Sequence, residues 1–375
     1  MHYQITGNEY ISLPTLRESD GAAEGVTFLY MQVKGLLELR GKAGLIRPYM
    51  EADGQRLPLH PRWTREHCWI PGFTSEKRTL RFSCVYLTPI GERGFMVRLV
   101  LENTGDAPQQ VRFGVEGEWS KTLHEINETT ELNAGREAYE SGWNHMFIFS
   151  QKPGLPLFAF APCVADPQQF AQIDQHAEWT RDGFAYDIYR ALTLQPGKKA
   201  VLDIPWGVGY DGVAAATSAK ELLRQGFEAV HERTVRWLAA REKRLADSRL
   251  SEILNTNLFF AFFYIPTKEL KNQLLYSLEQ EFSTQTFRTR IIGKMRDEGV
   301  IIASSSPKKG YKIPATKAEL YDFINHGTTI ILPMLERLKK CRDTIKLGTA
   351  NQLDLFEKTE YSNLKKYFDD INSGE

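Results

Sequence analysis

Strand-forming segments separated by turn residues follow one another from the N-terminus to about residue 206. Residues 94–119 are the clearest example: apolar and β-branched residues lead into the turn sequence NTGDAPQ, and an alternation of apolar and polar residues follows. Alternation with a period of two places the apolar side chains on one face of a strand. We therefore predict a hairpin with one face on a core. Its inward residues are Val111, Phe113, Val115 and Trp119, and its outward residues are Arg112, Glu116 and Glu118.

The strand pattern extends over the whole N-terminal half of the chain. Residues 186–210 predict a second hairpin around the turn Gln195-Pro196-Gly197. Many strands with regular turns and little helix signal predict a large antiparallel β-sandwich over residues 1–212. Further strand-like segments are 26–41, 78–89, 145–151 and 156–162.

Helical spacing of apolar residues replaces this pattern over residues 213–264. It is found first over 217–247 and then in a second, capped segment that ends in an apolar run. We expect linker helices here. The expected fold class is therefore multidomain, mainly β and then α.

The composition of the chain changes near Tyr264. Residues 1–264 hold 20 Arg and 9 Lys, whereas residues 265–375 hold 5 Arg and 13 Lys, and all seven tryptophans precede the split. Net charge changes from −3 (29 basic and 32 acidic residues) to +3 (18 and 15). This shift predicts a domain boundary and favours two pieces of different ancestry, joined by fusion, rearrangement or engineering. The alternative is that two domains of one protein simply differ in composition.

The order of segments over residues 1–264 carries a resemblance. A large sandwich is followed by LQPGKKAVLDIPWGVGYD, by a helix ending in TVRWLAAREKRL, and by SRLSEILNTNLFFAFFY. This order resembles the N-terminal region of glucoamylase- and glycogen-debranching-type glycoside hydrolases. The resemblance implies a β-supersandwich whose linker helices lead into an (α/α)6 barrel that holds the catalytic carboxylates. The 111 residues after Tyr264 are too few for such a barrel, so no glycosidase activity is expected.

Glu116 and Glu118 form a candidate pair of catalytic carboxylates. On one face of a strand they lie about 6.6 Å apart, at ~3.3 Å per residue, which is near the spacing of inverting glycosidases. Neighbours on one strand cannot flank a scissile bond from opposite sides, so a solvated sheet face is the favoured interpretation. His60, His67 and Cys68 are candidate zinc ligands, but no fourth ligand has a familiar spacing.

Aromatic residues in RWTREHCWIPGF are candidate carbohydrate contacts, because indole and phenyl rings stack on sugar rings. They are Trp63, Trp69 and Phe73. The alternative is packing in the core, where large aromatic side chains usually lie.

Residues 265–316 carry a second resemblance. Ser283 is a good N-cap for a helix to Asp297, and VIIAS, SSPKKG and YKIP read as a strand, a basic turn and a returning strand. These segments resemble the recognition helix and wing of winged helix-turn-helix domains, with 267–280 as the preceding helix. The resemblance implies binding to duplex DNA, with Lys308 and Lys309 on phosphates. The alternative is a module for packing or protein contacts. The face expected in the major groove carries Thr286, Thr289, Arg290, Gly293 and Arg296.

Residues 317–375 predict a helical region whose end is disordered. Apolar residues over 328–346 follow a coiled-coil spacing of 3 and 4, which favours a homodimer. Packing of this short seam against its own chain is the alternative. The seam residues are Ile331, Met334, Leu338, Cys341 and Ile345.

Several classes of function are not indicated. We find no nucleotide-binding loop, so no cofactor is expected. The N-terminus has no signal-peptide pattern, and the apolar run 258–265 is too short to span a membrane. A cytoplasmic location is expected, with the four scattered cysteines as free thiols. Two hypotheses follow: a non-enzymatic DNA-binding protein with the sandwich as a scaffold, or a carbohydrate-binding or accessory fragment of a glycoside hydrolase.

Overall fold

The computed structural model resolves two compact units, Met1–Ile313 and Pro314–Glu375. In the second unit only Tyr321 and Arg337 are described, so the seam predicted over 328–346 and the predicted disordered end lie outside the description. The boundary predicted near Tyr264 also lies in a segment that is not described. The described residues are 3–29, 36–125, 129–132, 135–141, 146–151, 159–162, 173–244, 248–262, 283–297, 302–305, 310–312, 321 and 337.

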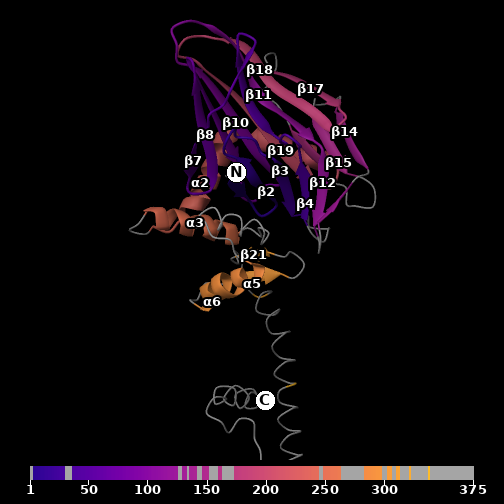
Figure 1. Cartoon of the computed structure of the whole chain (residues 1–375), viewed down its shortest axis with the longest axis vertical. Coiled ribbons are helices and arrows are strands. Elements are labelled where there is room, and N and C mark those ends of the chain that lie inside the picture. Colours follow the sequence, from indigo (N-terminus) through magenta and orange to yellow (C-terminus); the bar gives the residue numbers. More distant parts are fainter. Residues whose placement is uncertain are drawn as a thin grey trace, which may run out of the picture. The chain divides into compact units, whose positions relative to one another are not determined.

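Three antiparallel sheets make up most of the first unit (Figure 1). They confirm the predicted sandwich of packed β-sheets. The six-stranded sheet has the order β1 (Tyr3–Gly7), β2 (Ile11–Arg17), β3 (Gly25–Leu29), β4 (Leu36–Arg40), β12 (Lys121–Glu125), β13 (Thr129–Glu131). The eight-stranded sheet has the order β14 (Arg136–Glu140), β15 (Phe147–Gln151), β16 (Ala159–Pro162), β19 (Lys199–Gly209), β10 (Gly94–Asn103), β9 (Leu80–Leu87), β8 (Ile70–Lys77), β7 (Arg62–Glu66). The five-stranded sheet has the order β17 (Ile173–Trp179), β18 (Phe184–Leu194), β11 (Gln109–Trp119), β5 (Arg47–Ala52), β6 (Gln55–Leu57).

The two predicted hairpins are wrong in their pairing. β10 pairs with β9 and β19, whereas β11 pairs with β5 and β18, so both turns carry the chain from one sheet to another. The buried Asn103 joins the two turns: its side-chain amide donates to the carbonyls of Ala107 (2.8 Å) and Leu194 (2.9 Å). Its backbone carbonyl accepts from the Gly197 N–H at 2.8 Å. Turn residues indicate a reversal of the chain but not which strands then pair.

One continuous buried cluster draws side chains from all three sheets. Val111, Phe113, Val115 and Trp119 belong to it, as the alternation in the sequence predicts. Trp206 of β19 stacks on Phe95 of β10, with ring centroids 5.7 Å apart. The five-stranded sheet therefore buries one face in this core and leaves the polar side chains of β11 on the other.

Helices follow the last long strand, as predicted. Helix α1 (Gly212–Gln225) begins at the N-cap Asp211, whose carboxylate accepts from the Ala214 N–H at 2.7 Å. It packs on β19, where a Cβ on Gly207 would lie 2.1 Å from the Ala215 carbonyl oxygen. Gly226, with a φ of 78°, ends α1 and begins α2 (Phe227–Ala239), so the helical spacing predicted over 217–247 is divided at this glycine.

Helix α3 (Ser248–Phe262) matches the second predicted linker helix. Phe259 on α3 is buried against Trp69, with ring centroids 5.9 Å apart. A further helical segment consists of α5 (Thr284–Thr286), the π-helical η2 (Phe287–Gly293) and α6 (Lys294–Asp297). β20 (Ala303–Ser305) and β21 (Gly310–Lys312) then form an antiparallel pair. None of the described helices is long and apolar enough to cross a membrane.

Candidate functional site

Polar side chains gather on the face of the five-stranded sheet that points away from the core. The register of β5, β11 and β18 places these residues in adjacent rows. Strand alternation puts every second residue of each strand on this face. We call it the polar face. Its rows are Arg47–Glu116–Asp187, Tyr49–Gly114–Tyr189 and Glu51–Arg112–Ala191, and Glu118, Arg56, Asp174, His176 and Glu178 extend it.

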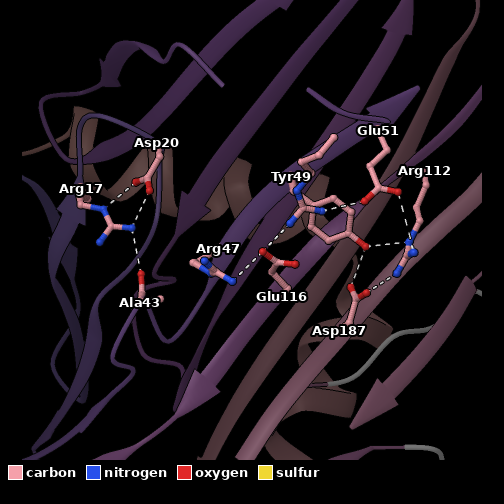
Figure 2. A network of polar contacts seen from close by, with 10 residues as sticks. Arg17, Asp20, Ala43, Arg47, Tyr49, Glu51, Arg112, Glu116 and Asp187 are labelled. Atoms are coloured by element: carbon pink, nitrogen blue, oxygen red, sulfur yellow. Dashed lines mark hydrogen bonds and ion pairs between the residues drawn. The ribbon is translucent and has the colours of Figure 1, made fainter. Parts of the chain in front are cut away.

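Glu116 lies between two guanidinium groups (Figure 2). Its Oε1 is 2.8 Å from Arg47 Nη2 and 2.5 Å from Arg56 Nη2. Arg56 also contacts Glu51, with Nη1 3.2 Å from Oε1. Glu116 is therefore a charge-compensated carboxylate rather than a free catalytic group. Glu118 lies on the same face, as the sequence predicted.

Asp187 is the acidic residue that directly opposes Glu116 across β11 and β18. The Tyr49 hydroxyl donates to its Oδ1 at 2.8 Å, and the Arg112 guanidinium pairs with its Oδ2. Burial raises the pKa of Asp187, and its bonds to Tyr49 and Arg112 oppose that shift. Burial also raises the pKa of Tyr49, and the Asp187 carboxylate raises it further. The neighbouring carboxyl groups of Glu116 and Asp187 thus have different partners: two guanidinium groups for Glu116, and a phenol and a guanidinium group for Asp187.

Arginine side chains cover the tyrosine rings of the polar face. The guanidinium carbon of Arg56 lies 3.6 Å from the centroid of the Tyr49 ring, and that of Arg112 lies 3.6 Å from the Tyr189 ring. These are cation–π distances. Tyr49 is only 2% exposed as a result. The face is an array of guanidinium, carboxylate and phenol groups that contact one another.

Most residues of this network were not predicted from the sequence as candidate site residues. Arg47, Tyr49 and Asp187 come from strands that lie far from β11 in the chain. The only local signal is the alternation in RPYMEA and FAYDIYRALTL, which shows an outward face but not its neighbours.

The three aromatic candidates for sugar contact lie elsewhere in the sandwich. Trp69 and Phe73 are 0% and 2% exposed, so their rings lie in the core, as the packing alternative expected. Trp63 is partly exposed; its Nε1 donates to the Glu18 carbonyl at 3.0 Å and its ring packs on Phe73 at 5.0 Å. Only Trp63 keeps part of its ring available for a ligand.

The candidate zinc ligands do not form a cluster. His67 and Cys68 make the turn between β7 and β8, and both approach Glu242: His67 Nδ1 is 3.0 Å from Oε2 and Cys68 Sγ is 3.7 Å from Oε1. Burial, and then the Glu242 carboxylate, raise the pKa of Cys68 to about 11. The His60 N–H donates instead to Ser75. Across the part of the chain that is described, no three His, Cys, Asp or Glu side chains are arranged to hold a metal ion.

Five of the seven candidate DNA contacts lie on the segment 283–297. Ser283 caps it as predicted, since its Oγ accepts from the Thr286 N–H at 3.0 Å. Thr289 and Arg290 are exposed, and Thr286 and Gly293 are partly exposed. Arg296 is exposed but donates to the Ile302 carbonyl, with Nη2 2.6 Å away. The predicted DNA-facing side assumed the 100° rotation per residue of an α-helix. Because η2 is a π-helix, its residues rotate by a different angle, so only part of that side is retained. Lys308, Lys309 and the predicted helix 267–280 are outside the described residues.

Comparisons with known proteins bear on the fold. The sequence matches no protein-family model and no curated protein. A protein from the human microbiome described as a candidate kojibiose phosphorylase is 10% identical, over 71% of this chain and 41% of that one, with a TM-score of 0.49. A bacterial glucoamylase complexed with acarbose is 8% identical. The match covers 69% of this chain and 40% of the glucoamylase, with a TM-score of 0.44. A candidate aldose 1-epimerase from Escherichia coli K12 is 11% identical. The match covers 56% of this chain and 99% of the epimerase, with a TM-score of 0.36.

The chain spans about two fifths of the length of the phosphorylase and of the glucoamylase. Solved structures of the glycoside hydrolase type are among those similar to its β-rich N-terminal part, at 8–10% identity.

Proposed function

We propose that the sandwich is a non-catalytic module that binds carbohydrate through the polar face. The observation that carries this proposal is the network around Glu116 and Asp187 (Figure 2), in which three arginines, three carboxylates and a phenol hold one another on an exposed side of a sheet. Such fixed donors and acceptors are the groups that orient a ligand rich in hydroxyl groups.

Two further observations support the proposal. The order of segments over 1–264 resembles the N-terminal region of glucoamylase-type hydrolases. The side chains of Arg47, Arg56 and Arg112 are 36–40% exposed, so the network is open to a ligand along its edge. Since Glu116 and Asp187 lie on one sheet face and are both held by guanidinium groups, binding rather than hydrolysis is the expected activity.

Calorimetric titration of the full chain with maltoheptaose and a panel of other oligosaccharides tests this function. We expect binding that weakens by about tenfold or more in a Glu116→Gln, Asp187→Asn double variant, because hydrogen bonds to charged groups contribute about 1.5–3 kcal/mol each. Glu232→Gln, at an exposed position of α2 outside the polar face, is the matched control and should bind as the wild type does. Binding to none of the panel, or equal binding by the double variant, would overturn the proposal.

DNA binding by the segment 283–312 is a second candidate. The observation that favours it is the run of exposed basic side chains on one capped helical segment, followed by an antiparallel strand pair. Arginine can pair with guanine in the major groove, whereas Lys308 and Lys309 would contact phosphates. The exposed basic residues are Arg288, Arg290, Lys294 and Arg296.

Fluorescence anisotropy of the full chain with labelled duplexes at rising salt tests this candidate. We expect affinity to fall steeply with salt. Arg290→Ala should cost about 1–3 kcal/mol on a preferred site, and Lys308→Ala with Lys309→Ala should weaken all sequences alike. Arg224→Ala, an exposed arginine on α1, is the control. The candidate fails if no duplex or single strand binds in a salt-dependent way.

A further inference from the structure

Two polar atoms at one end of the polar face have no hydrogen-bond partner among the described residues. They are Arg47 Nε, a donor, and Glu118 Oε1, an acceptor, and both are buried. Arg47 opposes Glu116 across β5 and β11, and Glu118 follows two residues later on the same face. Such diagonal neighbours have Cβ atoms within about 8 Å.

The backbone around Gly44 brings the two side chains to the same place. The Glu118 N–H donates to the Gly44 carbonyl at 3.2 Å. The stem of Arg47 packs over Gly44, where an added Cβ would lie 2.8 Å from Arg47 Cγ. The unpaired donor and the unpaired acceptor thus belong to two residues that both approach Gly44. Each unpaired buried polar atom costs folding free energy, and a partner that restores its hydrogen bond recovers it.

A hydroxyl group that reaches both atoms would satisfy them at once, because it accepts one hydrogen bond and donates another. An anionic group would satisfy the donor only and would repel the Glu118 carboxylate. The side chain of Arg47 is 39% exposed and so borders solvent, and a ligand that reaches the two buried atoms requires the ends of the two side chains to rotate.

Charge on the rest of the polar face also disfavours anions. Each guanidinium already contacts a carboxylate: Arg47 pairs with Glu116, Arg56 with Glu116 and Glu51, and Arg112 with Asp187. Six carboxylates share this face with three guanidinium groups, which leaves it net negative. The carboxylates are Glu51, Glu116, Glu118, Asp174, Glu178 and Asp187.

We propose that Arg47 and Glu118 form a subsite for a hydroxyl group of an uncharged sugar. This rests on the proposed carbohydrate binding and deepens it, since it names both the ligand class and two contact residues. The subsite selects neutral glycans over uronic acids or sulfated sugars of the same length.

Titration of the full chain with maltoheptaose, and with an oligogalacturonate of equal length, tests the subsite in three variants. Glu118→Leu removes the acceptor and should weaken maltoheptaose binding about tenfold, the effect of one hydrogen bond to a charged group. Glu118→Gln keeps an acceptor and should bind within about threefold of the wild type. Arg47→Lys keeps a cation for Glu116 but lacks the Nε donor, and should weaken binding as Glu118→Leu does. Glu232→Gln, on α2 and outside the polar face, is the control.

Thermal unfolding of the same variants separates a ligand contact from a structural role. An unpaired Glu118 predicts that Glu118→Leu leaves the melting temperature unchanged or raises it, whereas a structural carboxylate would lower it. Preference for the oligogalacturonate, a lowered melting temperature in Glu118→Leu, or wild-type binding by that variant would overturn the subsite. If Glu118→Leu binds as the wild type does while the Glu116→Gln, Asp187→Asn variant loses binding, the subsite is excluded but the proposed function stands. Binding to no carbohydrate would remove both.

Discussion

Gly114 lies at the centre of the polar face and has no side chain between Tyr49 and Tyr189. A Cβ at this position would lie 2.1 Å from the Ile188 carbonyl oxygen and 2.8 Å from Tyr189 Cβ. The constraint is space rather than backbone conformation, because the contact atoms belong to the neighbouring strand β18. Glycine is therefore required here for β11 and β18 to pair closely.

Gly114→Ala should lower the free energy of unfolding by about 2–3 kcal/mol, because the added methyl forces the two strands apart. Urea denaturation measures the change. Ala191→Ser, at the exposed outward position next to Arg112 on β18, should stay within about 0.5 kcal/mol of the wild type. A Gly114→Ala variant as stable as that control would show that the strands separate without cost.

Asp187 gives a prediction about pH. Burial raises its pKa in the folded chain above about 3.9, the value of an unfolded aspartate. The folded chain then keeps this proton at pH values at which the unfolded chain has lost it, so the contribution of Asp187 to stability is largest below the unfolded pKa and falls as pH rises through the folded pKa.

The free energy of unfolding of the wild type relative to Asp187→Asn should therefore decline from pH 4 and level off above the raised pKa. Urea denaturation of both proteins at several pH values from 4 to 7 measures this difference. A difference that grows with pH would mean that the bonds from Tyr49 and Arg112 outweigh burial and lower the pKa.

At the scale of elements, α1 packs on the eight-stranded sheet. Gly207 and Gly209 let it approach β19 closely, and its buried residues are Ala215, Ala216, Ala219 and Leu222. Its first turn is held by the Asp211 cap. The small residues on both surfaces explain why a helix can lie so near the strand.

Asp211→Ala should cost about 1 kcal/mol of stability, because the Ala214 N–H loses its acceptor. Asp211→Asn keeps a side-chain oxygen at the cap and should differ from the wild type by a few tenths of a kcal/mol. Chemical denaturation of both variants distinguishes the cap from the charge. Equal losses in the two would show that the negative charge at the helix N-terminus, rather than the hydrogen bond, is what matters.

For the whole molecule, we expect the purified chain to hydrolyse no α- or β-glucoside. Glu116 is held by two guanidinium groups, and Glu118 lies on the same side of the same strand, so the two cannot act from opposite sides of a sugar. Release of p-nitrophenol from aryl glucosides measures the activity, with a bacterial glucoamylase as a positive control. Turnover that disappears in a Glu116→Gln, Glu118→Gln double variant would contradict this expectation.

The sequence by itself determined which side chains of a strand share a face. Val111, Phe113 and Val115 are in the core, and Arg112, Glu116 and Glu118 are on the opposite side, because the side-chain period of a strand is a local property. It likewise placed the Ser283 cap, whose hydrogen bond closes within three residues.

Only the tertiary structure decided which strands are neighbours. The turns after β10 and β18 have the composition of hairpins, yet each joins two sheets, because pairing depends on contacts between residues far apart in the chain. For the same reason the polar face could not be foreseen: Arg47, Glu116 and Asp187 meet through the register of three strands from three regions of the sequence. A local pattern specifies an outward residue, but the charge that it faces is set by long-range packing.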